Sequence, residues 1–68
     1  MENRHVEVEQ VDQAYVIAMR EHGDPRKYFW AKRGGWTMRL SGAARYSERI
    51  ARDYLAGHHE ELMAAGKG

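Results

Sequence analysis

Three stretches in the middle of the chain have the pattern of β-strands. Residues 14–19 form a short apolar run rich in β-branched and aromatic side chains, and residues 27–32 have the same character. Residues 36–40 alternate strictly between apolar and polar side chains, which is the period of a half-buried strand. Because these stretches are short and follow one another closely, they predict a three-stranded antiparallel β-meander over residues 13–40.

The residues between these stretches favour tight turns. Residues 21–26 hold the single proline among polar residues, and residues 34–35 are a Gly-Gly pair, whose members both accept the positive φ of a hairpin turn. The alternation that follows this pair predicts Trp36, Met38 and Leu40 on one face of the third strand.

The first twelve residues carry an acidic excess and allow two interpretations. They are either a frayed polar arm or an extension of the first strand, since His5 to Glu9 also alternates between polar and apolar side chains. We favour an ordered extension over Val6 to Val11, because a mobile arm would leave three valines in water.

Residues 47–65 have the spacing of an amphipathic helix. Its apolar stripe consists of Ile50, Ala51, Tyr54, Leu55, His58, Leu62 and Ala65. Ser47 suits the N-cap, where its hydroxyl accepts from a backbone N–H group, and Glu48 suits the positive end of the helix dipole. Gly57 either weakens one continuous helix or divides it in two; the stripe keeps its phase across Gly57, which favours a single bent helix. Residues 66–68 are expected to be a loose end.

Together these elements predict one small α+β domain over residues 1–68. The length is far below that at which chains divide into separate cores, and the 43% hydrophobic and 31% charged residues are typical of a globular chain. The helix is expected to pack on one face of the meander, which leaves the other face and an edge strand open. Alternation then places either Phe29 or the pair of Tyr28 and Trp30 on the open face.

The net charge of +1 conceals an uneven distribution along the chain. Residues 1–19 sum to −3, residues 20–45 to +5 and residues 46–68 to −1. The basic middle coincides with the aromatic strands, and local patches rather than net charge attract partners. We predict that the partner-binding residues are Arg26, Lys27, Tyr28, Trp30, Lys32, Arg33 and Arg39. The alternative is that these cations only solvate strand edges and turns.

Catalytic and metal chemistry have little support in the sequence. The chain has no cysteine, its two serines have structural explanations, and it contains neither a nucleophile-elbow nor a phosphate-loop motif. His58 and Glu61 could supply two metal ligands, but no third ligand has supporting spacing. We therefore expect no catalytic residue, no metal and no cofactor, and so short a chain has little wall with which to enclose a pocket.

The expected location is the cytoplasm, without a membrane partner. No stretch approaches the roughly 18 apolar residues of a membrane span. The first residues lack the basic-then-apolar pattern of a signal peptide, and the absence of cysteine fits a reducing compartment.

Four short motifs carry a resemblance to known proteins. They are, in order, Tyr15-Val16-Ile17, Tyr28-Phe29-Trp30, Gly35-Trp36, and an Ala-x-x-Tyr-Ser start of a helix at Ala43, Tyr46 and Ser47. In this order, over residues 14–57, the chain resembles short phage and prophage proteins. Several anti-CRISPR and other anti-defence proteins are similar in size, in cysteine-poor composition and in a small sheet-plus-helix layout. The resemblance implies a non-enzymatic inhibitor that occupies a surface of a defence complex in the host cytoplasm, and it assigns no role to any residue.

Two functions from different classes follow. The first is a small protein-binding module, an anti-CRISPR-like inhibitor from a phage or mobile element that occupies a surface of a bacterial defence nucleoprotein complex. The alternative is a single-stranded nucleic-acid-binding protein, in which Tyr28 and Trp30, or Phe29, stack on bases while nearby cations neutralise phosphates. A homodimer that pairs open sheet faces or edges is compatible with either, since so small a core gains stability from added burial.

Overall fold

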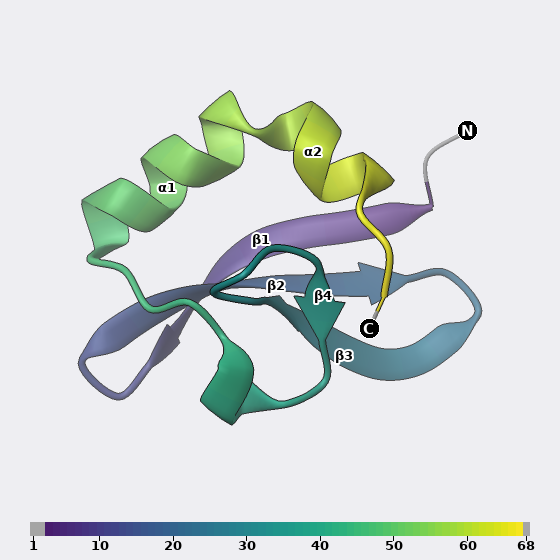
Figure 1. Ribbon diagram of the computed structural model, residues 1–68, viewed down its shortest axis with the longest axis horizontal. Coiled ribbons are helices and arrows are strands. Elements are labelled where there is room, and N and C mark those ends of the chain that lie inside the picture. Colours follow the sequence, from purple (N-terminus) through teal and green to yellow (C-terminus); the bar gives the residue numbers. More distant parts are fainter. Residues whose placement is uncertain (1–2, 68) are drawn as a thin grey trace.

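Four antiparallel strands and two short helices form the fold of residues 3–67, the part of the chain that the computed structural model describes (Figure 1). The strands are β1 (Arg4–Val11), β2 (Ala14–Glu21), β3 (Asp24–Trp30) and β4 (Trp36–Thr37), in that order across one sheet. A 3-10 turn, η1 (Leu40–Gly42), leads to α1 (Glu48–Gly57) and α2 (His59–Ala64), which lie on one face of the sheet. The predicted α+β class is confirmed, with one strand and one helix more than the sequence pattern predicts among these residues.

The N-terminal residues form a complete edge strand. β1 pairs with β2 along its whole length, beginning with Arg4 opposite Glu21. Asp12 lies in the turn of this hairpin with a φ of 57°, a left-handed conformation that aspartate tolerates better than most residues. Of the two interpretations of this region, the ordered one therefore holds, but as a separate antiparallel strand. Residues 1–2 of the predicted arm lie outside the described residues.

The third predicted strand is much shorter than the alternation indicates. It contains only Trp36 and Thr37, and the chain leaves the sheet where the Thr37 hydroxyl accepts a hydrogen bond from Arg39 N at 3.1 Å. Side-chain acceptors of this kind compete with the strand ladder for backbone donors. Leu40 then enters η1, and Met38 is 50% exposed, so the prediction that both continue the strand on the buried face of Trp36 is wrong.

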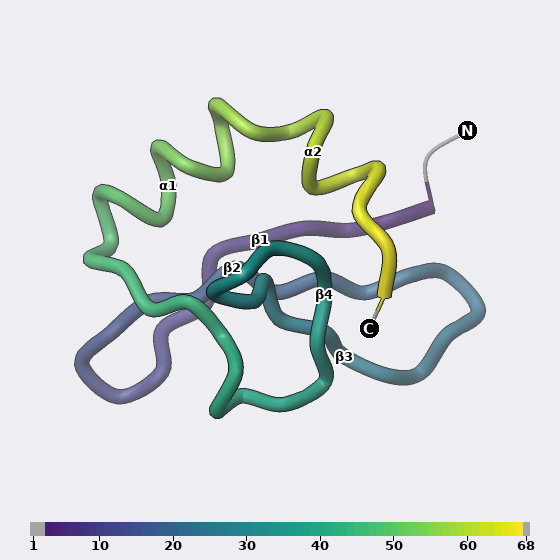
Figure 2. Tube along the Cα trace, viewed as in Figure 1, coloured from purple at the N-terminus to yellow at the C-terminus, as the bar shows by residue number. Residues whose placement is uncertain are grey.

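The helical region begins where the sequence predicts and ends differently. Ser47 is the N-cap of α1, and its Oγ accepts from Ile50 N at 3.3 Å. α1 ends at Gly57, and His58 has non-helical backbone angles of φ −123° and ψ 31°. Figure 2 shows the resulting break before α2. The prediction of one bent helix is wrong, and the alternative of two short helices holds, because glycine lowers the cost of leaving the helix.

Contacts of His58 keep the two helices in register across this break. Its backbone N–H donates to Tyr54 O at 2.9 Å, and its carbonyl accepts from Leu62 N at 2.9 Å. Its ring stacks on Tyr54 with centroids 3.9 Å apart. Tyr54 and Leu62 therefore both reach the core, whereas Ile50, also predicted on this stripe, is 52% exposed.

The core lies between the helices and the face of the sheet that they cover. Its buried side chains are Ile17, Met19, Tyr28, Trp30, Trp36 and Leu62. Trp30 meets Trp36 edge to face with ring centroids 5.0 Å apart, and its indole nitrogen donates to the Tyr54 hydroxyl at 3.1 Å. Since Tyr28 and Trp30 are both buried here, alternation puts Phe29 on the opposite face of β3.

The C-terminal tail returns to the sheet and covers Trp36. Trp36 N donates to Gly66 O at 3.1 Å, and the indole nitrogen donates to Leu62 O at 3.1 Å. Lys67 also forms a parallel bridge with Trp36. The expectation of a loose end is therefore wrong for Gly66 and Lys67, and residue 68 lies outside the described residues.

Candidate functional site

Two of the seven predicted partner-binding residues lie in the core. Tyr28 and Trp30 are each 3% exposed, and Trp30 is enclosed by Trp36 and Tyr54. Neither ring can stack on a base or fill a pocket of a partner without unfolding the domain. Phe29 is half-buried on the opposite face, so it is the aromatic ring of β3 that remains accessible.

Two further candidates, Arg26 and Lys27, are held by carboxylates of the same chain. Arg26 Nε lies 2.9 Å from the Asp24 carboxylate. Lys27 Nζ reaches across the open face to Glu9, 2.6 Å from one carboxylate oxygen and 2.8 Å from the other, with its ammonium 5.9 Å from the centre of the Phe29 ring. Because these charges are already neutralised in part, they contribute less to the attraction of a partner than free cations do.

The remaining three candidates are exposed and unpaired. Lys32, Arg33 and Arg39 make no ion pair with any carboxylate of residues 3–67, and neither do Arg45 and Arg49. We call residues 31–50, which contain all five cations, the basic segment. Its one acidic residue, Glu48, pairs with Arg52 at 2.9 Å.

Arg45 and Arg49 are not among the predicted partner-binding residues, although the sequence contains a signal for them. A charge sum over residues 20–45 includes Arg20 and Arg26 and ends just before the helix. A sum over residues 31–50 finds five basic residues against one acidic residue, so the excess of positive charge continues past residue 45 into the predicted helix.

Backbone hydrogen bonds hold the basic segment against the sheet. Lys32 N donates to Gly42 O at 3.2 Å, and Ala44 N donates to Trp30 O at 2.9 Å. Tyr15 and Tyr46 exchange a pair of backbone hydrogen bonds of 2.9 and 2.8 Å, which anchors the segment beside β2 just before α1. The segment is thus positioned by its main chain, and its charged side chains are left without an internal role.

Exposed hydrophobic side chains accompany these cations. Among the described residues, Met38 and Ile50 are the large hydrophobic residues with half or more of their surface exposed. Each is next to an arginine of the basic segment in the sequence: Met38 precedes Arg39, and Ile50 follows Arg49. Methionine and arginine are both enriched in the contact surfaces of protein complexes.

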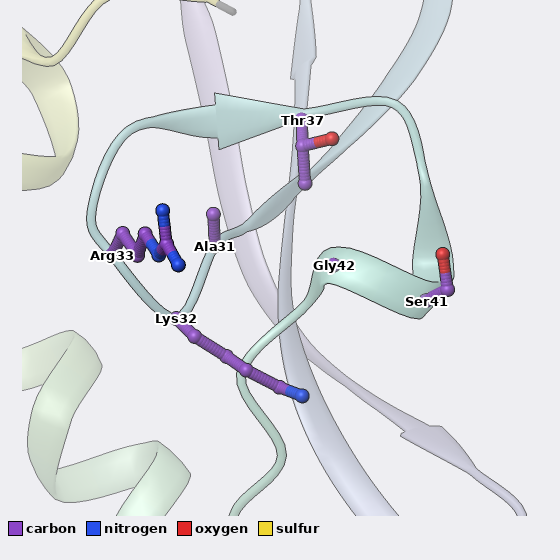
Figure 3. Close-up of a pocket in the computed structure, with 6 residues that line it drawn as sticks. All are labelled: Ala31, Lys32, Arg33, Thr37, Ser41 and Gly42. Atoms are coloured by element: carbon purple, nitrogen blue, oxygen red, sulfur yellow. The ribbon is translucent and has the colours of Figure 1, made fainter.

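A small pocket opens between the β3–β4 turn and η1 (Figure 3). It has a volume of about 260 Å³ and is lined by Ala31, Lys32, Arg33, Thr37, Ser41 and Gly42. In Figure 3 the Thr37 side chain projects from β4 toward Gly42, and the Lys32 side chain crosses the segment that follows Gly42. The lining contains two cations, two hydroxyl groups and no carboxylate, so its electrostatic character is positive.

A network of ion pairs, which we call the ion-paired cluster, joins the start of β1, the β2–β3 turn and the C-terminal tail. It comprises Arg4, Glu21, Asp24, Arg26 and Lys67. Glu21 accepts from Arg4 Nε and from Lys67 Nζ, both at 2.6 Å, and Lys67 Nζ also lies 3.4 Å from Asp24. A guanidinium nitrogen of Arg4 donates to the carbonyls of Leu62 and Ala65 at 3.1 and 2.8 Å, where it satisfies the end of α2.

The ion-paired cluster shifts the proton equilibria of its members. Hydrogen bonds from Lys67 and then Arg4 lower the pKa of Glu21, and hydrogen bonds from Arg26 lower the pKa of Asp24 well below its usual range. The Glu21 carboxylate raises the pKa of Lys67. Each shift favours the charged form of the side chain, which the ion pairs require. The pairs of Lys67 with Glu21 and Asp24 join the C-terminal tail to the β2–β3 turn.

A second concavity lies at the break between the helices. It has a volume of about 400 Å³ and is lined by residues 56–61, which include His58, His59 and Glu61. No group of three or more His, Cys, Asp or Glu side chains within residues 3–67 is arranged to hold a metal ion. Nor is any described helix long and apolar enough to cross a membrane.

Comparison with known proteins adds no family to this description. The chain matches no protein-family model, and the searches of curated proteins and of solved structures return no similar protein.

Proposed function

We propose that the protein is a small, non-enzymatic binding module whose basic segment docks on an acidic surface of a partner protein. The observation that carries the proposal is the conjunction of five unpaired cations with the exposed Met38 and Ile50 in one segment of twenty residues. Elsewhere in residues 3–67, cations are mostly held by carboxylates of the same chain. Long-range attraction by free cations and contact by apolar side chains are complementary parts of protein recognition.

A protein partner is favoured over single-stranded nucleic acid. A sequence-independent nucleic-acid surface needs aromatic rings on which bases stack, and Tyr28 and Trp30 are buried. Phe29 remains on the open face, but the cation beside it, Lys27, is paired with Glu9. Exposed Met38 and Ile50 have no counterpart in phosphate binding, whereas they suit the apolar centre of a protein interface.

The class of partner is suggested by the resemblance to phage anti-defence proteins. Bacterial defence nucleoprotein complexes are therefore the first partners to test, with inhibition by occupation of their surface as the proposed mode of action.

The proposal is tested by reversing charges in the basic segment. The double variant Arg33→Glu with Arg39→Glu should fold normally and lose the partner, because both side chains are exposed and unpaired among the described residues. The matched control is Arg20→Glu, compared with Arg33→Glu and Arg39→Glu as single variants, because Arg20 is also exposed and has no ion pair within residues 3–67 but lies outside the segment. Tagged proteins would be incubated with bacterial lysate at physiological salt, and affinities for the identified partner measured by calorimetry.

Two outcomes would contradict the proposal. One is retention of the partner by a folded variant with the segment reversed, and the other is equal loss by the control. The nucleic-acid alternative is tested with mixed single-stranded oligonucleotides at low salt. Binding that weakens steeply with salt, and that the segment variant loses, would replace the protein partner with nucleic acid.

The homodimer stays a prediction, and the edge of β1 disfavours one route to it. If two copies of β1 paired in antiparallel fashion around Val8, Glu7 of one copy would lie opposite Glu9 of the other, and like charges directly opposite are destabilising. A dimer through the open face around Phe29 avoids this repulsion. Sedimentation equilibrium at high micromolar concentration tests for this dimer, and finding only monomer at that concentration would contradict it.

A further inference from the structure

The pocket beside the β3–β4 turn extends this proposal to the chemistry of one contact. We infer that the pocket seats the carboxylate of an aspartate or glutamate side chain from the partner protein, between Lys32, Arg33 and Thr37. The inference rests on the proposed function, because it names the group on the acidic partner that enters the basic segment.

The size of the pocket points to one side chain. Its volume is about 260 Å³, below the roughly 300–1,000 Å³ of pockets that enclose whole small-molecule ligands. A single acidic side chain, inserted from the surface of a partner, suits this space. Side chains that fill a partner's pocket are a common centre of binding energy in protein interfaces.

The groups at the pocket suit a carboxylate in particular. The Arg33 guanidinium presents several donors in a planar fork, Lys32 adds a compact positive charge, and Thr37 carries a hydroxyl. No lining residue is acidic, and neither cation pairs with a carboxylate of residues 3–67, so an incoming anion displaces no internal ion pair. Both cations of the pocket are therefore available to an anion in the free protein.

The backbone around the pocket is fixed before a partner arrives. Gly34 and Gly35 hold the turn with φ values of 88° and 79°, Gly34 N donates to Ala31 O at 3.0 Å, and Ala31 N donates to Gly35 O at 3.0 Å. Lys32 N donates across the pocket to Gly42 O at 3.2 Å. A site whose main chain is already ordered loses less entropy on binding.

Gly42 keeps the pocket open. A Cβ atom at this position would lie 3.6 Å from Thr37 Cγ2, in ordinary van der Waals contact, and the glycine has no left-handed φ that would strain another residue. A longer side chain would extend from there beside Thr37 and occupy the space. Gly42→Leu therefore fills the pocket while leaving every charge of the basic segment in place.

The experiment titrates ¹⁵N-labelled protein with a capped hexaglutamate peptide and follows the backbone amide signals. We expect saturable shifts at residues 31–42 in the wild type and about tenfold weaker binding to Gly42→Leu. The control Ala56→Leu enlarges an exposed side chain inside α1, away from the pocket, and it should bind as the wild type does. Binding by Gly42→Leu equal to the wild type would overturn the inference, yet leave the charge-reversal test of the proposed function standing.

A second pair of variants guards against misfolding of Gly42→Leu, which the amide spectrum would reveal. Lys32→Gln with Arg33→Gln should abolish the shifts at the pocket, whereas Arg45→Gln with Arg49→Gln removes two charges from the same segment and should keep them. Equal weakening of peptide binding by both pairs would show that the peptide is attracted by the general positive charge of the segment, and would overturn the proposed carboxylate site. A parallel titration with inorganic phosphate tests which anion binds. Amide shifts at residues 31–42 with phosphate, and none with the peptide, would overturn the inference that the ligand is a carboxylate.

Discussion

The two charged regions of this molecule use the same residue types for different purposes. In the ion-paired cluster, Arg4 and Lys67 both contact Glu21 at 2.6 Å, and the network joins the start of β1, the β2–β3 turn and the tail (Figure 1). In the basic segment, five cations make no ion pair within residues 3–67. In the first region, ion pairs within the chain neutralise the charges and hold the chain together. The second leaves its charge on the surface.

This difference shows why charge along a sequence is a weak guide to a binding site. Arg26 and Arg33 are both exposed arginines beside turns, and both fall in the basic middle of the chain. Asp24 holds Arg26 through two guanidinium nitrogens, at 2.9 and 3.3 Å, whereas no described carboxylate pairs with Arg33. The acidic neighbours that the fold brings near decide which cations stabilise the domain and which attract a partner.

The largest expected effect is on the residue to which the tail docks. Trp36→Ala removes a ring that is 1% exposed together with its hydrogen bond to Leu62 O, and should cost about 3–5 kcal/mol, enough to unfold so small a domain. Met38→Ala, two positions away in the same segment and half exposed, should change the free energy of unfolding by less than about 0.5 kcal/mol. Denaturant titration of both variants measures the two changes in the free energy of unfolding, and similar losses would contradict this prediction.

The next effect separates a paired arginine from an unpaired one. Arg4→Ala leaves the carbonyls of Leu62 and Ala65 without their side-chain donor, and should lower the free energy of unfolding by about 1–3 kcal/mol. Arg45→Ala should have almost no effect on stability. Thermal unfolding resolves the two, since about 1 kcal/mol shifts the melting temperature of a domain of this size by roughly 4–8 °C. An equal shift in both would contradict a structural role confined to the cluster.

The dependence of stability on pH tests the carboxylates of the cluster. The pKa values of Glu21 and Asp24 are lowered on folding, so their contribution is complete above their unfolded pKa values of about 4 and is lost as the pH falls through the folded values. Stability should therefore be level from neutral pH to about pH 5 and decline below about pH 4. Glu21→Gln with Asp24→Asn should be less stable at neutral pH and show a flatter acid decline. A decline as steep as that of the wild type would assign acid unfolding to other groups.

The smallest effect on stability is expected in the basic segment. Arg33→Glu with Arg39→Glu should leave the free energy of unfolding within about 0.5 kcal/mol of the wild type at each site, because neither side chain has an ion pair among the described residues. The same variant is expected to lose the partner. Marked destabilisation, measured by denaturant titration at neutral pH, would mean that these charges hold the fold after all.

Local signals in the sequence were reliable where the structure depends on nearby residues. The run of residues 14–19 became the buried centre of β2, the Gly-Gly pair adopted positive φ, and Ser47 capped α1. Predictions failed where a single local contact competed with the pattern. The chain leaves the sheet after Thr37, whose hydroxyl accepts from Arg39 N, and α1 ends at Gly57 although the apolar stripe continues into α2.

The sequence by itself determined the α+β class, the meander order of β2, β3 and β4 and the presence of a basic middle, because periodicity, turn residues and caps act within a few positions. Only the tertiary structure decided that Tyr28 and Trp30 face the helices, since alternation makes both faces of β3 aromatic. It also decided which cations are free. Glu9 lies eighteen residues from Lys27 and Lys67 lies forty-six from Glu21, and charges so far apart in sequence meet only when the chain folds.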